Sequence, residues 1–349
     1  MKKLVLLTLS AILIIASVFG SACISHEPQP DIDKKSVSIK YTDAQTIMQL
    51  LIDDNLDFGL LPEPAATTLE KVKGKNFTWT RLSLQELYDS ETKSYPQAVL
   101  MVKNDVLQDY PQIVRKMHEK FLDNATWVSE NASLAVNAIN TNFTSSTLNP
   151  NVIDQTVIEN CKISWQNAQS AKDQVKSYIQ NILAVNDSDI VAPAVSVGDD
   201  FFYYENNSVG NDANGKNFTF YAPDGAPALS IAKFISDGEN FVEGASFDYR
   251  VVVADNIAKY MNGALGKADF IVLPVNAASK LYKTQKYTMV SVVTHGNLYI
   301  MAKVKEQSAS ISLADLDAKK IGVIGQGLVP DLTLKTVLFK NSFEYSIVG

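Results

Sequence analysis

The chain has 349 residues, of which 46% are hydrophobic and 20% charged, and this is enough to build the cores of two ordinary domains. Its formal net charge is -7 at pH 7, and its arginines are Arg81, Arg115 and Arg250. Because phosphate binding needs clustered cations, the composition excludes nucleic acid as the expected partner. An anionic ligand would be held by helix N-termini or backbone amides instead of a cluster of guanidinium groups.

The N-terminus has the pattern of an export signal. Lys2 and Lys3 precede the apolar residues 4–18, and small residues follow as far as Ala22, which predicts a signal peptide over residues 1–22. Cys23 then resembles the acylated cysteine of a bacterial lipoprotein, followed by a polar tether over residues 23–36. We therefore expect the protein outside the cytoplasm, lipid-anchored to the outer face of the bacterial cell membrane or periplasmic. Ordinary cleavage after Ala22, which would release the protein, is the alternative.

The first half of the folded chain begins near Val37 with alternating strands and helices and then becomes mostly helical. Helical spacing of apolar residues follows Thr42 up to Asp53. A strand over residues 58–61 leads into Glu63 and Pro64, where Pro64 suits the first turn of a helix. Further strands are predicted at 77–82 and 98–102, and further helices at 111–128, 134–139, 152–159 and 166–183. Cys161 is expected to be a small buried hydrophobe and His118 an exposed or partly packed side chain.

Residues 206–216 have the composition of a flexible linker, and alternation restarts after them. A strand over 218–221 runs into a turn-rich loop and a helix over 229–234. The later predicted strands are 250–254, 270–273, 287–293, 298–303, 320–324 and 344–348, and the later helices are 257–261 and 332–339. The pattern as a whole predicts an α/β fold.

Four loops that follow predicted strands lead into helices, and ligands bind at such strand ends in open α/β sheets. Each loop alone is explained by ordinary turn-forming residues, but the four loops together predict a ligand cleft. Glu63 indicates an amine or hydroxyl on the ligand, whereas the helix N-termini indicate an anionic group. The candidate ligand-binding residues are Glu63, Pro64, Asp224, Gly225, Ala226, Pro227, Asn276, Ala277, Gln326, Val329 and Pro330, with His295 and Asn297 at the cleft edge. We expect no catalytic residue, metal site or cofactor, because the one internal cysteine and the scattered histidines form no recognisable cluster.

Five segments carry a resemblance to a known family: residues 61–67, 222–229, 273–278, 296–299 and 321–331. Together they resemble the ABC-transporter solute-binding proteins of the nitrate, sulfonate and taurine type. The resemblance implies a periplasmic-binding-protein-like fold of type II, with two α/β lobes, a hinge and a central ligand cleft. It also implies a monomer that captures a small organic or anionic solute and delivers it to an ABC importer permease.

The order of the segments departs from that family. The part like residues 218–348 comes first in the family, and the part like residues 37–64 follows it. The sequence therefore looks like a circular permutant in which residues 206–216 join the old ends. One lobe would be residues 95–303, and the other would combine 37–94 with 304–349. A structure that places Val37 far from Val348, with no shared sheet, would contradict this interpretation.

Two other functions stay open. An enzyme of the same fold related to thiamine-pyrimidine synthesis is one alternative, although that chemistry depends on a cysteine-rich motif that this chain lacks. An exported ligand-sensing protein, which presents its bound solute to another protein, is the other.

Overall fold

The computed structural model describes residues 34–72, 77–185, 192–205, 207–306 and 308–349. The chain divides into a unit that ends at Lys34 and a compact unit, Lys35–Gly349, which contains the described helices and strands. The predicted export signal, Cys23 and the tether up to residue 33 lie outside the described residues. Residues 35 and 36, which we assigned to the tether, belong instead to the first strand, because they pair with Phe343 and Glu344 in a sheet.

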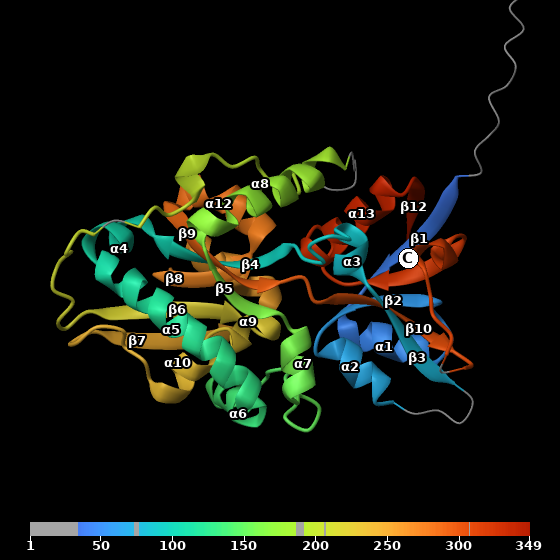
Figure 1. The fold of residues 1–349 in the computed structure, drawn as a ribbon, viewed down its shortest axis with the longest axis horizontal. Coiled ribbons are helices and arrows are strands. Elements are labelled where there is room, and N and C mark those ends of the chain that lie inside the picture. The colour runs from blue at the N-terminus through green and yellow to red at the C-terminus, as the bar shows by residue number, and fades with distance from the viewer. Residues whose placement is uncertain (1–33, 73–76, 186–191, 206, 307) are drawn as a thin grey trace, which may run out of the picture. The chain divides into compact units, whose positions relative to one another are not determined.

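The first sheet has six strands, drawn from both ends of the described chain. Four neighbouring strands are parallel, and β10 runs antiparallel to β2 and β3. In sheet order the strands are β12 (Phe343–Val348), β1 (Lys35–Tyr41), β11 (Lys319–Val323), β2 (Phe58–Pro62), β10 (Leu298–Val304) and β3 (Thr78–Ser83). Figure 1 shows β1 and β12, at the blue and red ends of the colour scale, side by side in this sheet.

The second sheet also has six strands, all from the middle of the chain. Its pairings are antiparallel except for β6, which runs parallel to both β7 and β8. In sheet order the strands are β5 (Ile163–Asn167), β9 (Tyr287–His295), β4 (Pro96–Lys103), β8 (Phe270–Pro274), β6 (Asn217–Pro223) and β7 (Ser246–Val252). The predicted α/β class, with two separate sheets, is confirmed.

Helices cover both faces of each sheet, and their buried side chains form the core clusters. The helices of the first sheet are α1 (Ala44–Ile52), α2 (Ala65–Glu70), α3 (Leu84–Tyr88) and α13 (Val329–Lys340). Those of the second sheet are α4 (Asn104–Asp109), α5 (Pro111–Glu130), α6 (Ala132–Asn142), α7 (Gln155–Asn160), α8 (Ala168–Ala184), α9 (Ala226–Leu229), α10 (Ala232–Asp237), α11 (Ile257–Asn262) and α12 (Val275–Gln285). Short 3₁₀ turns lie at Asp199–Phe201, Ala254–Asn256 and Leu313–Leu316.

The chain passes between the two sheets twice, through residues 89–95 and through Gly296 and Asn297. The second crossing corrects a predicted boundary: residues 298–303, assigned to the lobe 95–303, form β10 in the first sheet. The reason is the two-residue connection, which carries the chain directly from β9 into the other sheet. A side chain at Gly296 has no room, since an added Cβ would overlap the ring of Tyr95.

Two further predictions differ from the structure. Residues 163–167 form the edge strand β5, whereas the sequence predicted a helix from residue 166. The predicted linker is held against α5, because Arg115 donates to the carbonyl of Ser208 at 3.0 Å and Gln112 donates to the carbonyl of Asn211 at 2.7 Å. Residue 206 lies outside the described residues.

Candidate functional site

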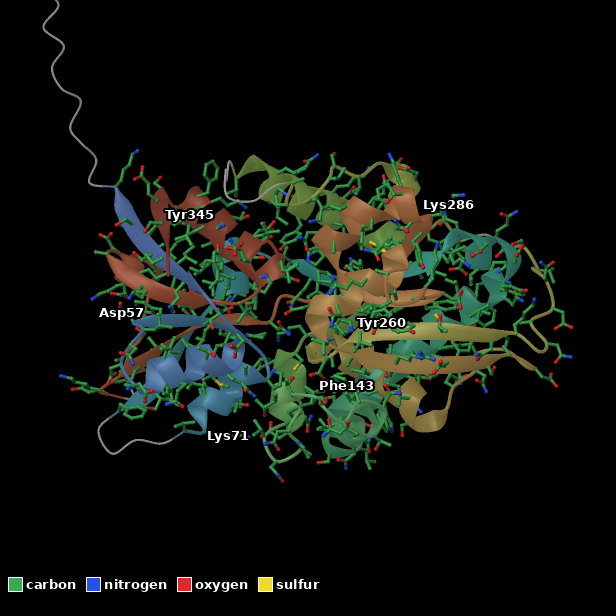
Figure 2. All side chains as sticks on the ribbon, turned by 180° about the vertical axis from the view of Figure 1, so that it is seen from behind. Asp57, Lys71, Phe143, Tyr260, Lys286 and Tyr345 are labelled. Atoms are coloured by element: carbon green, nitrogen blue, oxygen red, sulfur yellow. The ribbon has the colours of Figure 1, made fainter. Side chains whose placement is uncertain are left out.

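The helices and loops of the two sheets meet along a junction that direct hydrogen bonds cross. The hydroxyl groups of Tyr178 on α8 and Thr333 on α13 lie 2.6 Å apart, and both residues are buried. At another point of the junction, Lys71, which is labelled in Figure 2, donates to the carbonyl of Val152 at 2.6 Å. The two halves of the fold are therefore in contact in this structure.

Glu63 lies at this junction, but its carboxylate is already occupied. Arg81 donates to Oε1 at 2.9 Å, and the hydroxyl and backbone N–H of Thr67 donate to Oε1 and Oε2. Burial raises the pKa of Glu63, and the hydrogen bonds from Thr67 and the charge of Arg81 oppose this rise. Arg81 also pairs with Glu70 and lies over the ring of Tyr299. Glu63 thus stabilises the start of α2, where Pro64 occupies the N-cap position.

Asn297 occupies the second crossing between the sheets and is fully buried. Its backbone carbonyl accepts from the N–H of Glu63 at 3.0 Å, and its Nδ2 donates to the carbonyl of Cys161 at 3.4 Å. Its Oδ1 has no hydrogen-bond partner among the described residues. Cys161 is buried as predicted, and burial raises the pKa of its thiol.

Asn276, in the first turn of α12, spans the junction. Its Nδ2 donates to the carbonyl of Gly327 at 3.1 Å and to the carbonyl of Pro193 at 3.0 Å. Asn276 is fully buried, and within the described part of the chain its Oδ1 has no partner. The loop that carries Gly327 is fixed by Asp331, whose Oδ2 accepts from the Gly327 N–H at 2.8 Å.

The loop after β6 is fixed within its own half of the fold. The carboxylate of Asp224 accepts from the hydroxyl of Ser146 at 2.6 Å and from the N–H and hydroxyl of Thr147. Gly225 has a φ of 101°, a backbone conformation that favours glycine. Pro227 lies in the first turn of α9, and Ala226 is buried.

His295 ends β9, facing the edge strand β5. Its Nδ1 lies 2.8 Å from the hydroxyl of Ser164, and its Nε2 lies 3.3 Å from Oε1 of Gln166. Burial lowers its pKa to about 4, so the ring is neutral at pH 7. Both ring nitrogens of His295 are therefore in contact with side chains of β5.

The remaining predicted residues are divided between solvent and core. Gln326 is exposed, whereas Val329 and Ala277 are buried in the core cluster that includes residues of both sheets. Pro330 lies in the first turn of α13. The structure therefore places Asn276, Asn297 and Glu63 at the junction. The side chains of Asp224 and His295 instead contact residues of their own half of the fold.

Sequence reasoning missed a buried ion pair beside the loop that contains Gly327. Asp331 and Lys335, one helical turn apart on α13, are both fully buried, with Nζ 3.4 Å from Oδ1. The hydroxyl of Tyr41 also donates to Oδ1 of Asp331 at 2.9 Å. The sequence contained a signal for this pair, because Asp331 and Lys335 are spaced i,i+4 in a helix that is mostly apolar.

Two surface cavities flank the junction. One, of about 410 Å³, lies between Lys71 and the ends of α5, α6 and α7. The other, of about 490 Å³, lies between α3, α8 and Lys340 of α13. Neither is lined by a predicted ligand-binding residue. Among the described residues, no cluster of His, Cys, Asp and Glu could hold a metal ion.

No helix in the described ranges combines the length and apolar character that crossing a membrane requires.

Comparison with known proteins gave the following results. No protein-family model and no curated protein matches the chain. Solved structures match weakly. The oligopeptide-binding protein AppA from Bacillus subtilis, in complex with a nonapeptide, matches with a TM-score of 0.33 and 11% identity, over 79% of this chain and 57% of that one. NikA from Staphylococcus aureus, in complex with Ni(L-His)2, matches with a TM-score of 0.33 and 8% identity, over 78% and 58% of the two chains.

A substrate-binding protein from Microbacterium hydrocarbonoxydans, complexed with 4-hydroxybenzoate hydrazide, matches with a TM-score of 0.30 and 8% identity, over 79% and 56% of the two chains. The chain thus spans 56–58% of the length of these three structures. The class that the described structure itself defines is an α/β fold of two sheets, joined by two chain crossings.

Proposed function

We propose that this protein is an extracytoplasmic solute-binding protein, which captures a small organic or anionic solute at the junction between its two sheets and delivers it to an ABC importer permease. The observation that carries the proposal is at the junction itself. Asn276 and Asn297 are fully buried there, and each has an amide oxygen without a partner among the described residues. Buried polar atoms are nearly always hydrogen-bonded in native proteins, so these two oxygens indicate a missing partner.

The mechanism is binding by closure. A solute enters when the two halves separate, which breaks the bonds from Asn276 to Gly327 and from Tyr178 to Thr333. It then stabilises the closed form because it contacts both halves at once. The two crossings, residues 89–95 and 296–297, are the segments about which the halves would move.

The circular permutation remains part of the proposal. Lys40 pairs with Val348 in parallel strands. The two ends of the fold therefore share a sheet, and the arrangement that would contradict a permutation is not observed. The likeness to the nitrate, sulfonate and taurine type rests on the sequence segments alone.

Lipid anchoring at Cys23, a monomeric state and delivery to a permease complete the proposal. Mass spectrometry of the N-terminal peptide from a membrane fraction tests the anchor, since acylated Cys23 would be the first residue. An unmodified N-terminus in the soluble fraction would indicate a released protein instead.

The solute-binding role is tested by calorimetry on the full chain. The panel contains nitrate, sulfonates, amides, polyols and amino-heterocycles. Native mass spectrometry of the freshly purified protein tests separately for a retained solute. We expect saturable binding with one solute per chain. No retained solute and no binding across the panel would refute the proposed role.

A further inference from the structure

Several buried side chains have a polar atom without a partner among the described residues, and three of them lie at or just after the C-terminal ends of β8 and β9. These three are Asn276, Thr294 and Asn297, and the atoms are Oδ1, Oγ1 and Oδ1. Each residue is 0% exposed. A polar atom left in this state is costly, and it therefore marks a place where a hydrogen-bonding group is missing.

The chemistry of the neighbours fixes which amide atom is left over. Asn276 faces two backbone carbonyls, those of Gly327 and Pro193, and Asn297 faces the carbonyl of Cys161. A carbonyl only accepts, so the NH₂ group must point to it in each case. The remaining amide atom is therefore an oxygen, which requires a donor.

The three residues lie at the same end of the second sheet. Ala98 of β4 pairs with Pro274 on one side and with Thr294 on the other. Asn276 follows Pro274 by two positions at the start of α12, and Asn297 follows Thr294 by three positions at the crossing to the first sheet. This end of the sheet is also where the bond from Asn276 to Gly327 reaches the other half of the fold.

Two cations at the junction are each held beside carboxylates. The guanidinium of Arg81 binds Glu63 and Glu70, and the ammonium of Lys335 lies beside Asp331. Lys162, which follows Cys161, is exposed to solvent. An anion has no hydrogen to donate to the two unpartnered amide oxygens, whose partial negative charge repels it, so its binding there is unfavourable.

We infer that the solute is neutral and donates hydrogen bonds: an amide, a sulfonamide, a polyol or a similar molecule with N–H or O–H groups. Two of its donors would pair with Oδ1 of Asn276 and Oδ1 of Asn297, while the hydroxyl of Thr294 takes a third hydrogen bond. This inference rests on the proposed solute-binding function and narrows its solute class away from nitrate and sulfonates.

Matched pairs of solutes test the class. Nicotinamide, benzenesulfonamide and acetamide are compared with nicotinate, benzenesulfonate and acetate, with inositol and nitrate added, by calorimetry on the full chain. We expect binding of neutral donors only. Binding of the anions alone would overturn the solute class and leave the solute-binding function standing. No binding in either group would refute the function itself, and the inference with it.

A conservative pair of variants tests the site. Thr294→Val removes the unpartnered hydroxyl while keeping the shape of the side chain. Ser291→Ala is the control, because Ser291 lies on the same strand, is also fully buried and also has a hydroxyl without a partner among the described residues. It pairs with Leu100 further along β4, away from the junction.

We expect both variants to have a Tm at or above that of the parent, since each removes an unpaired buried hydroxyl. Only Thr294→Val should weaken binding of the neutral solute, by about three- to tenfold, the loss of one hydrogen bond. Equal affinities in Thr294→Val and Ser291→Ala would overturn the assignment of Thr294 to the site.

Discussion

Acidification should destabilise the fold through His295. Burial lowers the pKa of this histidine from 6.5 to about 4 in the folded chain. The unfolded chain therefore binds a proton near pH 6.5, where the folded chain does not. The free energy of unfolding decreases with falling pH wherever the unfolded state binds more protons than the folded state. His295 therefore leaves stability unchanged above pH 6.5 and lowers it as the pH falls from 6.5 towards 4.

The magnitude follows from the size of the shift. At 1.36 kcal/mol per pKa unit, the full effect below pH 4 is about 3 kcal/mol, and about 2 kcal/mol of it is already lost at pH 5. Glu63 and Asp331, whose pKa values burial raises, act in the opposite direction over the acid range. A comparison with His295→Gln, which keeps both carboxyl groups, cancels their effect.

The assay is urea unfolding of the parent and of His295→Gln at pH 7 and pH 5, followed by tryptophan fluorescence. We expect the parent to lose about 2 kcal/mol more than the variant between the two pH values. The same loss in both proteins would refute the reasoning. Titration of His295 by NMR, with a midpoint near its ordinary value, would refute it independently.

Two substitutions and one chemical modification test other contacts of the structure. Asp331→Ala leaves Lys335 buried without the carboxylate beside it, so we expect a loss of about 3–5 kcal/mol in urea unfolding, with Asp331→Asn less affected; a loss below about 1 kcal/mol would contradict the buried pair. Tyr178→Phe removes the bond to Thr333 across the junction and should cost about 1 kcal/mol; unchanged stability would mean that the halves are not in contact in solution. Cys161, with its buried thiol and raised pKa, should resist iodoacetamide at pH 8 until urea unfolds the chain, as measured by peptide mass spectrometry, and rapid native alkylation would be the contrary result.

The sequence predicted the strands that have a clear apolar pattern in their own residues. β2 and β8 are short apolar runs that end at proline, and β11 ends in the apolar residues 321–323 before a glycine-containing loop; such runs are typical of strands buried on both faces. β5 was missed because its apolar face has only Ile163 and Trp165, and its polar residues continue into α8. The sheet that β10 joins could not be predicted, since pairing partners are not encoded in the strand itself.

The candidate site shows the same limit. The loops were recognised from glycine, proline and asparagine, but the state of each side chain depends on residues far away in the sequence. Asp224 appeared available until Ser146 and Thr147 were seen to occupy its oxygens. Thr294 gave no signal at all, because a threonine within a strand is ordinary, and only the structure reveals its unpaired hydroxyl. The ligand-binding roles of the predicted residues stay predictions.

The pairing of β1 with β11 and β12 also sets the order in which the two sheets can be completed, since a chain is made from its N-terminus. The strands of the second sheet are complete once residue 295 has been made, whereas β1 and β2 wait for partners that begin at Leu298. At a synthesis rate of about 5–20 residues per second, the roughly 240 residues between β2 and β10 take on the order of 10–50 s. During that interval β1 and β2 lack their sheet partners, so the first strands to be made are among the last that can be paired.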